Sequence, residues 1–307
     1  MPANLVPLPL TLGVAAAMLT RSFAEAGLDG PARDARVLVA AAAGVGTEML
    51  LAHPDRPLDA EAAARALAFC RRRIAREPVA RILGRREFYG RAFEIGPDVL
   101  DPRPDTETLV DLALGLVREA ASAGRRLRIL DVGTGSGCIA VTLLAELATA
   151  EAVATDVSAA ALALARHNAA VHGVVDRLDF VQTDVADGIA GPFDLIVSNP
   201  PYIAREVIAT LEPEVRCHDP VLALDGGVDG LTIYRHLAVA APRLLVPGGW
   251  IAVEVGIGQA SAVEQMFTEG LWQVPELTLL AGAVHAARDL AGVLRCVAVQ
   301  AHSSVVR

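Results

Sequence analysis

Residues 129–137 read Ile-Leu-Asp-Val-Gly-Thr-Gly-Ser-Gly, an apolar run that ends in a glycine-rich turn. The apolar residues predict a buried strand, and a helical stretch over 138–148 follows the turn directly. Glycines at alternate positions allow positive φ angles and let the backbone come close to a ligand. Strand, glycine turn and helix together are typical of nucleotide-binding α/β domains, although dinucleotide sites use nearly the same device. The spacing GxGxG, in place of GxGxxG, disfavours a dehydrogenase.

Short apolar runs and helical stretches alternate on both sides of this turn. The predicted strands lie at 128–132, 152–156, 178–184, 193–198 and 250–255, and helices such as 138–148 and 159–172 separate them. Such an order implies right-handed crossovers and a mostly parallel sheet that is covered on both faces. We therefore expect an α/β fold from residue 105 to 307.

Acidic residues stand at the ends of three of these strands. Asp131 ends the first strand, Asp156 the second and Asp184 the third. Ligands of open parallel sheets bind at the carboxyl ends of the strands, and an acid after the second strand can accept the hydroxyls of a ribose. Each aspartate alone also fits a helix cap or a turn. As a set they predict an adenosine pocket, formed by Asp131, Gly133, Thr134, Gly135, Ser136, Gly137, Asp156, Asp184, Val185 and Asn199.

The fourth strand runs into Asn199-Pro200-Pro201-Tyr202. Two prolines cannot continue a ladder, so the strand must stop here and project a stiff loop. The Asn199 side-chain oxygen and the Pro200 carbonyl could hold the two hydrogens of a planar NH2 group, and Tyr202 could stack on its plane. We take these four residues as the catalytic and substrate-binding loop. The motif fits adenine N6, cytosine N4 and a glutamine amide alike, whereas cytosine C5 is disfavoured because no Pro-Cys nucleophile is present.

The chain before residue 105 has a different character. Helical periodicity over 11–26, 31–44 and 58–82 predicts a small helical bundle in residues 1–85. Arginines at 71–73 and 76 fit either a solvated face or a surface for an acidic partner. Residues 86–104 read as a β-hairpin that turns at Gly90, followed by a proline-rich linker.

Composition excludes several classes of protein. The net charge is −9, which is a poor match for a phosphate backbone, so no stable nucleic-acid complex is expected. The four cysteines are scattered and the histidines show no ligand spacing, so neither a disulfide framework nor a metal site is predicted. No continuous apolar stretch is long enough for a convincing membrane span. We expect a monomeric cytoplasmic protein.

Several motifs together resemble the release-factor glutamine methyltransferases (PrmC/HemK), which are class I S-adenosylmethionine-dependent methyltransferases. They are the linker motifs 84–90 and 99–107, the loop Asp131–Gly137, Asn199–Tyr202, and the segments 212–216 and 223–227. The resemblance is specific over about residues 81–300 and weak over the helical bundle. Two positions depart from the family pattern: Asp101 stands where an apolar residue is expected, and Tyr89 where Trp is common.

The resemblance implies a fold, an activity and partners. It implies a Rossmann-like sheet of seven strands with an antiparallel last hairpin, and a bundle that helps to dock the substrate. Members transfer a methyl group from S-adenosylmethionine, with S-adenosylhomocysteine as product, to the glutamine of a Gly-Gly-Gln loop in class I peptide-chain release factors. Arg103, Thr106 and Glu107 would line the substrate pocket or brace its loop, but they also fit a helix start capped by Thr106 or Asp105.

Two other functions stay open at this point. An amino-group methyltransferase of DNA or RNA would share the Asn199–Tyr202 loop, but it would need a positively charged groove, which the sequence does not indicate. A non-catalytic scaffold that binds S-adenosylmethionine and a protein would not need an intact loop. The intact Asn199–Tyr202 loop favours the enzyme.

Overall fold

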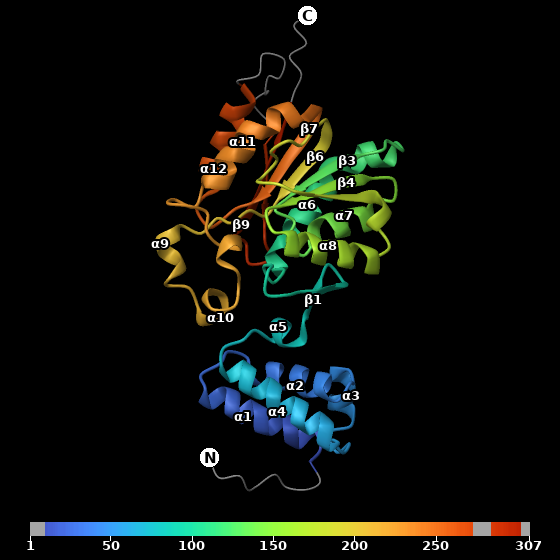
Figure 1. The fold of residues 1–307 in the computed structure, drawn as a ribbon, viewed down its shortest axis with the longest axis vertical. Coiled ribbons are helices and arrows are strands. Elements are labelled where there is room, and N and C mark those ends of the chain that lie inside the picture. The colour runs from blue at the N-terminus through green and yellow to red at the C-terminus, as the bar shows by residue number, and fades with distance from the viewer. Residues whose placement is uncertain (1–9, 273–283, 302–307) are drawn as a thin grey trace, which may run out of the picture. The chain divides into compact units, whose positions relative to one another are not determined.

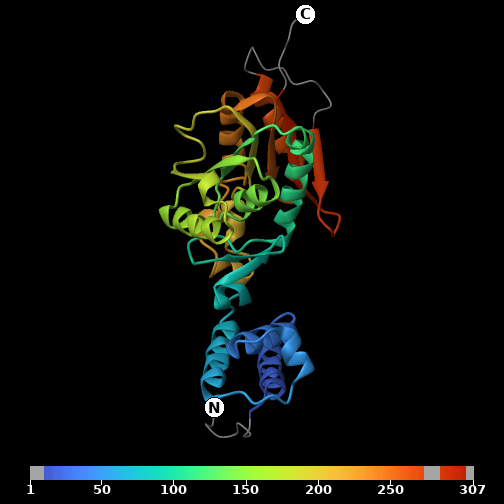
Figure 2. The same cartoon turned by 90° about the vertical axis from the view of Figure 1, so that its right-hand side faces the viewer.

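The computed structural model describes residues 10–272 and 284–301 (Figures 1 and 2). Contacts divide the chain into two compact units. The first is formed by the residues up to Arg85 together with Glu212–His218, and the second by Arg86–Leu211 and the residues from Asp219 onward. The sequence placed Glu212–His218 in the α/β domain of residues 105–307, because nothing in the composition of this segment links it to the bundle. Within the described residues, no helix is long and apolar enough to cross a membrane.

The first unit is a bundle of helices around an apolar core. Its helices are α1 (Leu12–Glu25), α2 (Pro31–Ala42), α3 (Thr47–Ala52), α4 (Ala60–Ile74) and α5 (Val79–Leu83), with the four-residue α10 (Pro213–Arg216) from the later segment. The helix predicted over 58–82 is wrong as a single element. It is broken where Arg76 takes a φ of 68° and Pro78 follows, because neither conformation continues an α-helix.

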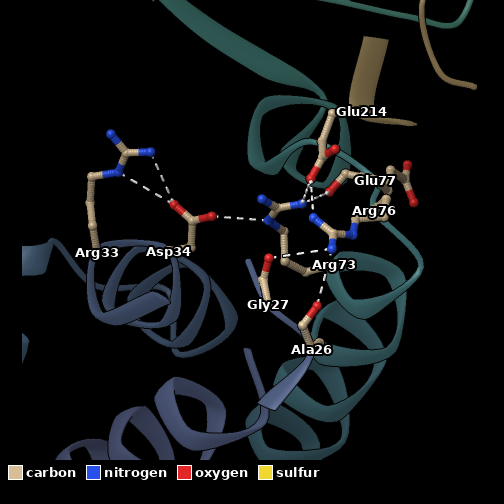
Figure 3. A network of polar contacts seen from close by, with 8 residues as sticks. All are labelled: Ala26, Gly27, Arg33, Asp34, Arg73, Arg76, Glu77 and Glu214. Atoms are coloured by element: carbon tan, nitrogen blue, oxygen red, sulfur yellow. Dashed lines mark hydrogen bonds and ion pairs between the residues drawn. The ribbon is translucent and has the colours of Figure 1, made fainter. Parts of the chain in front are cut away.

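A buried arginine joins three elements of this unit (Figure 3). The side chain of Arg73 is 8% exposed, and it pairs with Asp34 at 2.9 Å and with Glu214 at 3.2 Å. Arg76 also pairs with Glu214, and Arg72 pairs with Glu77. These arginines therefore have acidic partners inside the unit. For Arg73, the predicted alternative of a solvated face is wrong. The helical pattern could not reveal it, because the acids that pair with Arg73 lie on other segments.

A short hairpin opens the second unit. Strands β1 (Arg85–Phe88) and β2 (Arg91–Glu94) are joined by Tyr89 and Gly90, which have φ angles of 52° and 69°. Two consecutive positive φ angles are the signature of a tight hairpin turn, so the predicted turn at Gly90 is confirmed. Phe88 and Phe93 are both fully buried and meet edge to face, which anchors the hairpin on the core.

The second unit holds a seven-stranded sheet, which confirms the predicted Rossmann-like α/β fold. The strands lie in the order β5 (Leu178–Gln182), β4 (Glu151–Asp156), β3 (Arg128–Val132), β6 (Phe193–Ser198), β7 (Leu245–Glu254), β9 (Leu294–Gln300) and β8 (Val284–Arg288). The first five of these are parallel, and β9 is antiparallel to both β7 and β8. The third predicted strand ends at Gln182, so Asp184 lies in the loop beyond it.

Helices cover both faces of this sheet, as Figure 1 shows. Strand residues alternate between two apolar cores: Ile129 faces a core with α6 and α7, and Leu130 faces a core with α11 and α12. The helices of the unit are α6 (Glu107–Ser122), α7 (Cys138–Glu146), α8 (Ala159–Val171), α9 (Arg205–Ile208), α11 (Thr232–Leu244) and α12 (Ala260–Trp272), with 3-10 turns at Pro104–Thr106, Val175–Arg177 and Val221–Ala223. Burial on both faces explains why the strands read as continuous apolar runs.

Candidate active site

The sheet order reverses beside β3, with β4 and β5 on one side and β6 and β7 on the other. Parallel sheets of this kind leave a crevice at the carboxyl ends of the strands where the order reverses. A cavity lies at this point, within the second unit, with an empty volume of about 1150 Å³ that includes its solvent-filled mouth. The wall is mostly apolar with a few polar groups, which is the usual make-up of a small-molecule site.

Most of the residues that the sequence singled out line this cavity. They are Gly133, Thr134, Gly135, Ser136, Asp156, Asp184, Val185, Asn199, Pro200, Pro201, Arg103 and Thr106. Four others lie behind the wall or outside it: Asp131, Gly137, Tyr202 and Glu107. The lining also includes residues that the sequence did not assign to the pocket, among them Val99, Leu100, Pro102, Thr155, Ile139 and Leu222.

The glycine loop has the backbone that its sequence predicts. Gly133, Gly135 and Gly137 have φ angles of 72°, 55° and 81°. Nothing lies within 4 Å of a Cβ built on Gly133 or Gly135, so these two are needed for their conformation and leave open space for a ligand. Gly137 serves packing as well, since its Cβ would come within 3.1 Å of Ala165 on α8. The loop therefore offers a cradle that side chains do not fill.

Asp131 holds this loop from behind. Its carboxylate is fully buried and accepts hydrogen bonds from the Thr134 hydroxyl at 2.7 Å and the Ala140 amide at 3.3 Å. Burial raises its pKa to about 6, against the lowering effect of these two donors. In this structure the Asp131 carboxylate fixes the turn, and its role in cofactor binding stays a prediction.

Asp156 occupies the position predicted for a ribose acceptor. One carboxylate oxygen accepts from the Gly135 amide and the other from the Ser158 amide, both at 2.9 Å. Each oxygen has a second lone pair, so the side chain can still accept a ligand hydroxyl at the cavity wall. Nearby, Val185 has a φ of 51° and its carbonyl accepts from Thr155, while Asp184 is exposed. This set fits an adenosine moiety.

The Asn199–Tyr202 loop leaves β6 at the mouth of the cavity. Ser198 fixes the strand end by donating to the Val132 carbonyl at 2.7 Å. The Asn199 Nδ2 group donates to the Thr106 hydroxyl at 3.1 Å, which leaves Oδ1 as the acceptor of this amide. Thr106, predicted as a pocket residue or a helix cap, makes no cap hydrogen bond with its side chain and instead contacts Asn199.

A second segment supports the loop from the outside. The backbone of Ile203 exchanges hydrogen bonds with Leu224 and Gly226. At Gly226 a Cβ would lie 2.8 Å from the Pro201 carbonyl oxygen, so only glycine allows this approach. The Gln259 side chain donates to the Tyr202 carbonyl at 3.0 Å. Gly226 therefore allows the close approach to Pro201, a role that the sequence indicated only through the family motif 223–227.

The remaining predicted substrate residues make contacts within the second unit. Arg103 pairs with the buried Asp219 at 2.6 Å at the cavity wall. Glu107 accepts from the Tyr89 amide at 2.9 Å, so it holds the hairpin and does not line the cavity. The two departures from the family pattern also have partners: Asp101 lies 3.7 Å from the Arg86 guanidinium, and the Tyr89 hydroxyl donates to Asp111.

Sequence reasoning missed one buried acid beside the site. Glu254 ends β7 and is 1% exposed, and its carboxylate accepts from the Tyr202 hydroxyl at 3.3 Å. The signal for it was present, because a carboxylate at the end of an apolar parallel strand lies at the edge where ligands bind.

Comparison with known proteins covers both parts of the chain. The family model described as the PrmC N-terminal domain matches residues 15–84, and that described as the methyltransferase small domain matches residues 107–212. Release factor glutamine methyltransferase from Agrobacterium fabrum is 46% identical over 79% of this chain and 84% of its own. The protein of the same name from Cereibacter sphaeroides is 49% identical over 78% of this chain and 84% of its own. This chain belongs to the release factor glutamine methyltransferase family.

Solved structures of other proteins also resemble this chain. The hMettl16 catalytic domain in complex with a MAT2A 3'UTR hairpin superposes with a TM-score of 0.53, at 18% identity, over 80% of this chain and 83% of that one. At this identity the likeness shows the methyltransferase fold and nothing about the substrate.

Proposed function

We propose that this family member transfers a methyl group from S-adenosylmethionine to the side-chain amide nitrogen of the glutamine in the Gly-Gly-Gln motif of class I peptide-chain release factors. The observation that carries the proposal is the geometry of Asn199. Its Nδ2 group is bound by Thr106, so the amide oxygen is the atom available to a substrate at the cavity wall. Relatives of the same name that are 46% and 49% identical support this choice of reaction.

The residues present fit the cofactor. The glycine loop offers open space beside Gly133 and Gly135, and Asp156 places a carboxylate at the cavity wall for the ribose. Bound S-adenosylmethionine supplies a methyl group on a positively charged sulfur and leaves as S-adenosylhomocysteine. We assign Gly133–Ser136, Asp156 and Val185 to holding it, with Asp131 and Gly137 supporting the loop.

The loop residues act on the substrate amide. Its nitrogen is a weak nucleophile because its lone pair is delocalised into the carbonyl. Asn199 Oδ1 and the Pro200 carbonyl can each accept one of its two hydrogens. Positive charge grows on this nitrogen as the new bond forms, so both hydrogen bonds strengthen in the transition state. The nitrogen then releases one proton to water, and Pro201 and Tyr202 keep the acceptors in place.

The setting of the reaction follows from its substrate. All residues that line the cavity come from the second unit, and we propose that the enzyme acts as a monomer. Release factors act on ribosomes, so we place the reaction in the cytoplasm, with the bundle of residues 1–85 helping to dock the factor. The net charge of −9 disfavours a nucleic-acid substrate.

The test is transfer of labelled methyl groups to a purified release factor and to its Gln→Ala variant in the Gly-Gly-Gln motif. We expect label on the wild-type factor only. Label on both factors would move the reaction to another residue. Label on neither, with S-adenosylmethionine binding confirmed by calorimetry, would refute the proposed substrate, and label on RNA or DNA would establish the alternative.

A further inference from the structure

Glu254 is a buried carboxylate that the proposed reaction does not use directly. In the sheet, Val253 of β7 lies opposite Ser198 of β6, so Glu254 comes next to the start of the Asn199–Tyr202 loop. The Tyr202 hydroxyl donates to Oε1 of Glu254 at 3.3 Å, and the Tyr234 hydroxyl donates to its backbone carbonyl at 2.8 Å. Burying a carboxylate costs several kcal/mol unless donors satisfy it, so its surroundings matter.

By strict hydrogen-bond geometry, Oε2 of Glu254 is buried without a donor among the described residues. The Thr106 hydroxyl lies near enough to lower the pKa of this carboxyl, so it is the nearby side-chain donor that could satisfy Oε2. The same hydroxyl oxygen accepts from Asn199 Nδ2 at 3.1 Å. Thr106 therefore lies between Asn199 and Glu254, and its hydroxyl proton is available to the carboxylate.

No guanidinium is dedicated to this carboxylate among the described ion pairs. Arg295, the cation that acts on it, is bound to Asp105 and Asp289, each at 2.8 Å. Burial raises the pKa of Glu254 to about 7. The ionisable groups that act on it or feel its charge are Tyr202, Tyr234, Arg295, Asp105, Cys138 and Cys296. Among them Arg295 is the cation, and Asp105 is held in an ion pair with it.

We propose that Glu254 is a positioning residue for methyl transfer, whose ionised carboxylate accepts from Thr106 and Tyr202 and thereby holds Asn199 with its amide oxygen toward the substrate. This inference rests on the proposed function. It adds to that function the reason why one of two nearly isosteric orientations of the Asn199 amide is selected.

The argument depends on the single proton of the Thr106 hydroxyl. When Glu254 is ionised it can only accept, so Thr106 donates to it and must use its lone pair to accept from Asn199 Nδ2. When Glu254 is protonated it can donate to Thr106, which is then free to donate to Asn199 Oδ1. The amide would turn over and present NH2 to the NH2 of the substrate, where no hydrogen bond can form.

Kinetics of matched variants test this chain. We expect Thr106→Val and Glu254→Gln each to lower kcat about 10–100-fold, the loss typical for a displaced transition-state acceptor. The KM for the release factor and the Kd for S-adenosylmethionine should stay within about threefold of the wild-type values, because the lost interaction acts in the transition state and not in ground-state binding. Thr106→Ser keeps the hydroxyl and should retain nearly wild-type kcat. The Thr106→Val/Glu254→Gln double variant should be no slower than the slower single variant, because both changes interrupt one chain.

The pH dependence gives a readout that a purely structural role would not move. Wild-type kcat should rise as the pH increases through about 7, where Glu254 loses its proton, and this rise should be absent in Glu254→Gln. Thermal unfolding of each variant, measured beside the kinetics, shows whether it is folded at the assay temperature.

A spectroscopic measurement tests the inference without any activity. The chain has three asparagines, at positions 4, 168 and 199, so selective 15N-asparagine labelling gives three side-chain NH2 signals. Asn199→Ala assigns the signal of interest. This signal should shift with pH through about 7 in the wild type and stay constant in Glu254→Gln. Asn168 is the internal control, because both carbonyls that it donates to, those of Glu94 and Ser136, are not titratable.

The outcomes separate the two proposals. Failure of the wild-type enzyme to label the release factor would refute the proposed function, while the Asn199 signal would still decide the positioning. Wild-type kcat in folded Glu254→Gln and Thr106→Val, or losses that add in the double variant, would overturn the positioning role. An Asn199 signal that does not respond to pH or to Glu254→Gln would overturn it as well.

Discussion

Gly226→Ala is the sharpest test of how the Asn199–Tyr202 loop is held. A Cβ at this position would lie 2.8 Å from the Pro201 carbonyl oxygen, 2.8 Å from the Gly230 Cα and 2.9 Å from the Gly230 carbonyl oxygen. These are backbone atoms on both sides, so no flexible side chain can move away. Ordinary contacts begin at 3.4 Å, and the loop must therefore move by roughly half an ångström.

The size of the effect follows from this displacement. Overpacking of a tight contact costs about 1–3 kcal/mol, which corresponds to a fall in Tm of roughly 2–10 °C in a unit of this size. A misplacement of about 1 Å can cost ~100-fold in rate, so half of that distance should lower kcat about 10-fold. The glycine loop follows β3, and the close neighbours of Gly226 are Gly230 and Pro201, so the Kd for S-adenosylmethionine should stay unchanged.

The assay is methyl transfer to a release factor, with cofactor binding by calorimetry and unfolding by circular dichroism. Gly115→Ala is the matched control, because Gly115 is an exposed residue of α6 with nothing within 4 Å of its Cβ. It should gain about 1 kcal/mol of stability from helix propensity and keep wild-type activity. A Gly226→Ala enzyme with kcat within about twofold of the wild type would show that the contact of Gly226 with Pro201 does not control the position of the Asn199 and Pro200 acceptor oxygens.

Three further predictions follow from the structure. Asn199→Ala should lower kcat about 100–1000-fold while the Kd for S-adenosylmethionine stays nearly constant, which single-turnover kinetics and calorimetry check. Asp34→Ala should cost about 3–5 kcal/mol in urea unfolding because Arg73 is buried, and Glu214→Gln should cost less since Asp34 remains; equal losses would contradict the network. Burial raises the pKa of Glu254 from 4.5 to about 7, so the folded state holds this proton more tightly than the unfolded chain does. The stability that the bound proton contributes is complete below about pH 4.5 and is lost as the pH rises through about 7. Relative to the wild type, Glu254→Gln should therefore gain up to about 3 kcal/mol between pH ~4.5 and ~8, and parallel curves from urea unfolding would refute this.

The parts of the fold that were predictable are those written in local patterns. Strands buried on both faces read as apolar runs, and the glycines at 133, 135 and 137 have the positive φ angles that their spacing suggested. The break at Arg76 was not predictable in the same way, because the helical periodicity of α4 and α5 continues across it and only Pro78 signals the interruption. The membership of Glu212–His218 in the first unit depends on ion pairs that span more than a hundred residues.

The site divides along the same line. Sequence showed which residues follow each strand, and the parallel sheet brings them to one edge. Sequence could not show which of these side chains point to the ligand and which bind other parts of the protein, because that depends on residues far along the chain. Asp131 was predicted to bind the cofactor, and Glu107 to line the pocket or brace its loop; in this structure the Asp131 carboxylate accepts from Thr134 and the Glu107 carboxylate from the Tyr89 amide.

The same reasoning explains why Glu254 matters although no motif includes it. A glutamate in an apolar strand is costly to bury, and the nearby Arg295 is already bound by Asp105 and Asp289. A hydrophobic residue of similar volume would fill the space without this cost. Tyr202 donates to this carboxylate and Thr106 lies near enough to lower its pKa, and Thr106 also accepts the hydrogen bond from Asn199. The stability lost by burying this charge is thus linked to the orientation of the Asn199 amide. Glu254→Gln should therefore lower kcat while it raises the free energy of unfolding.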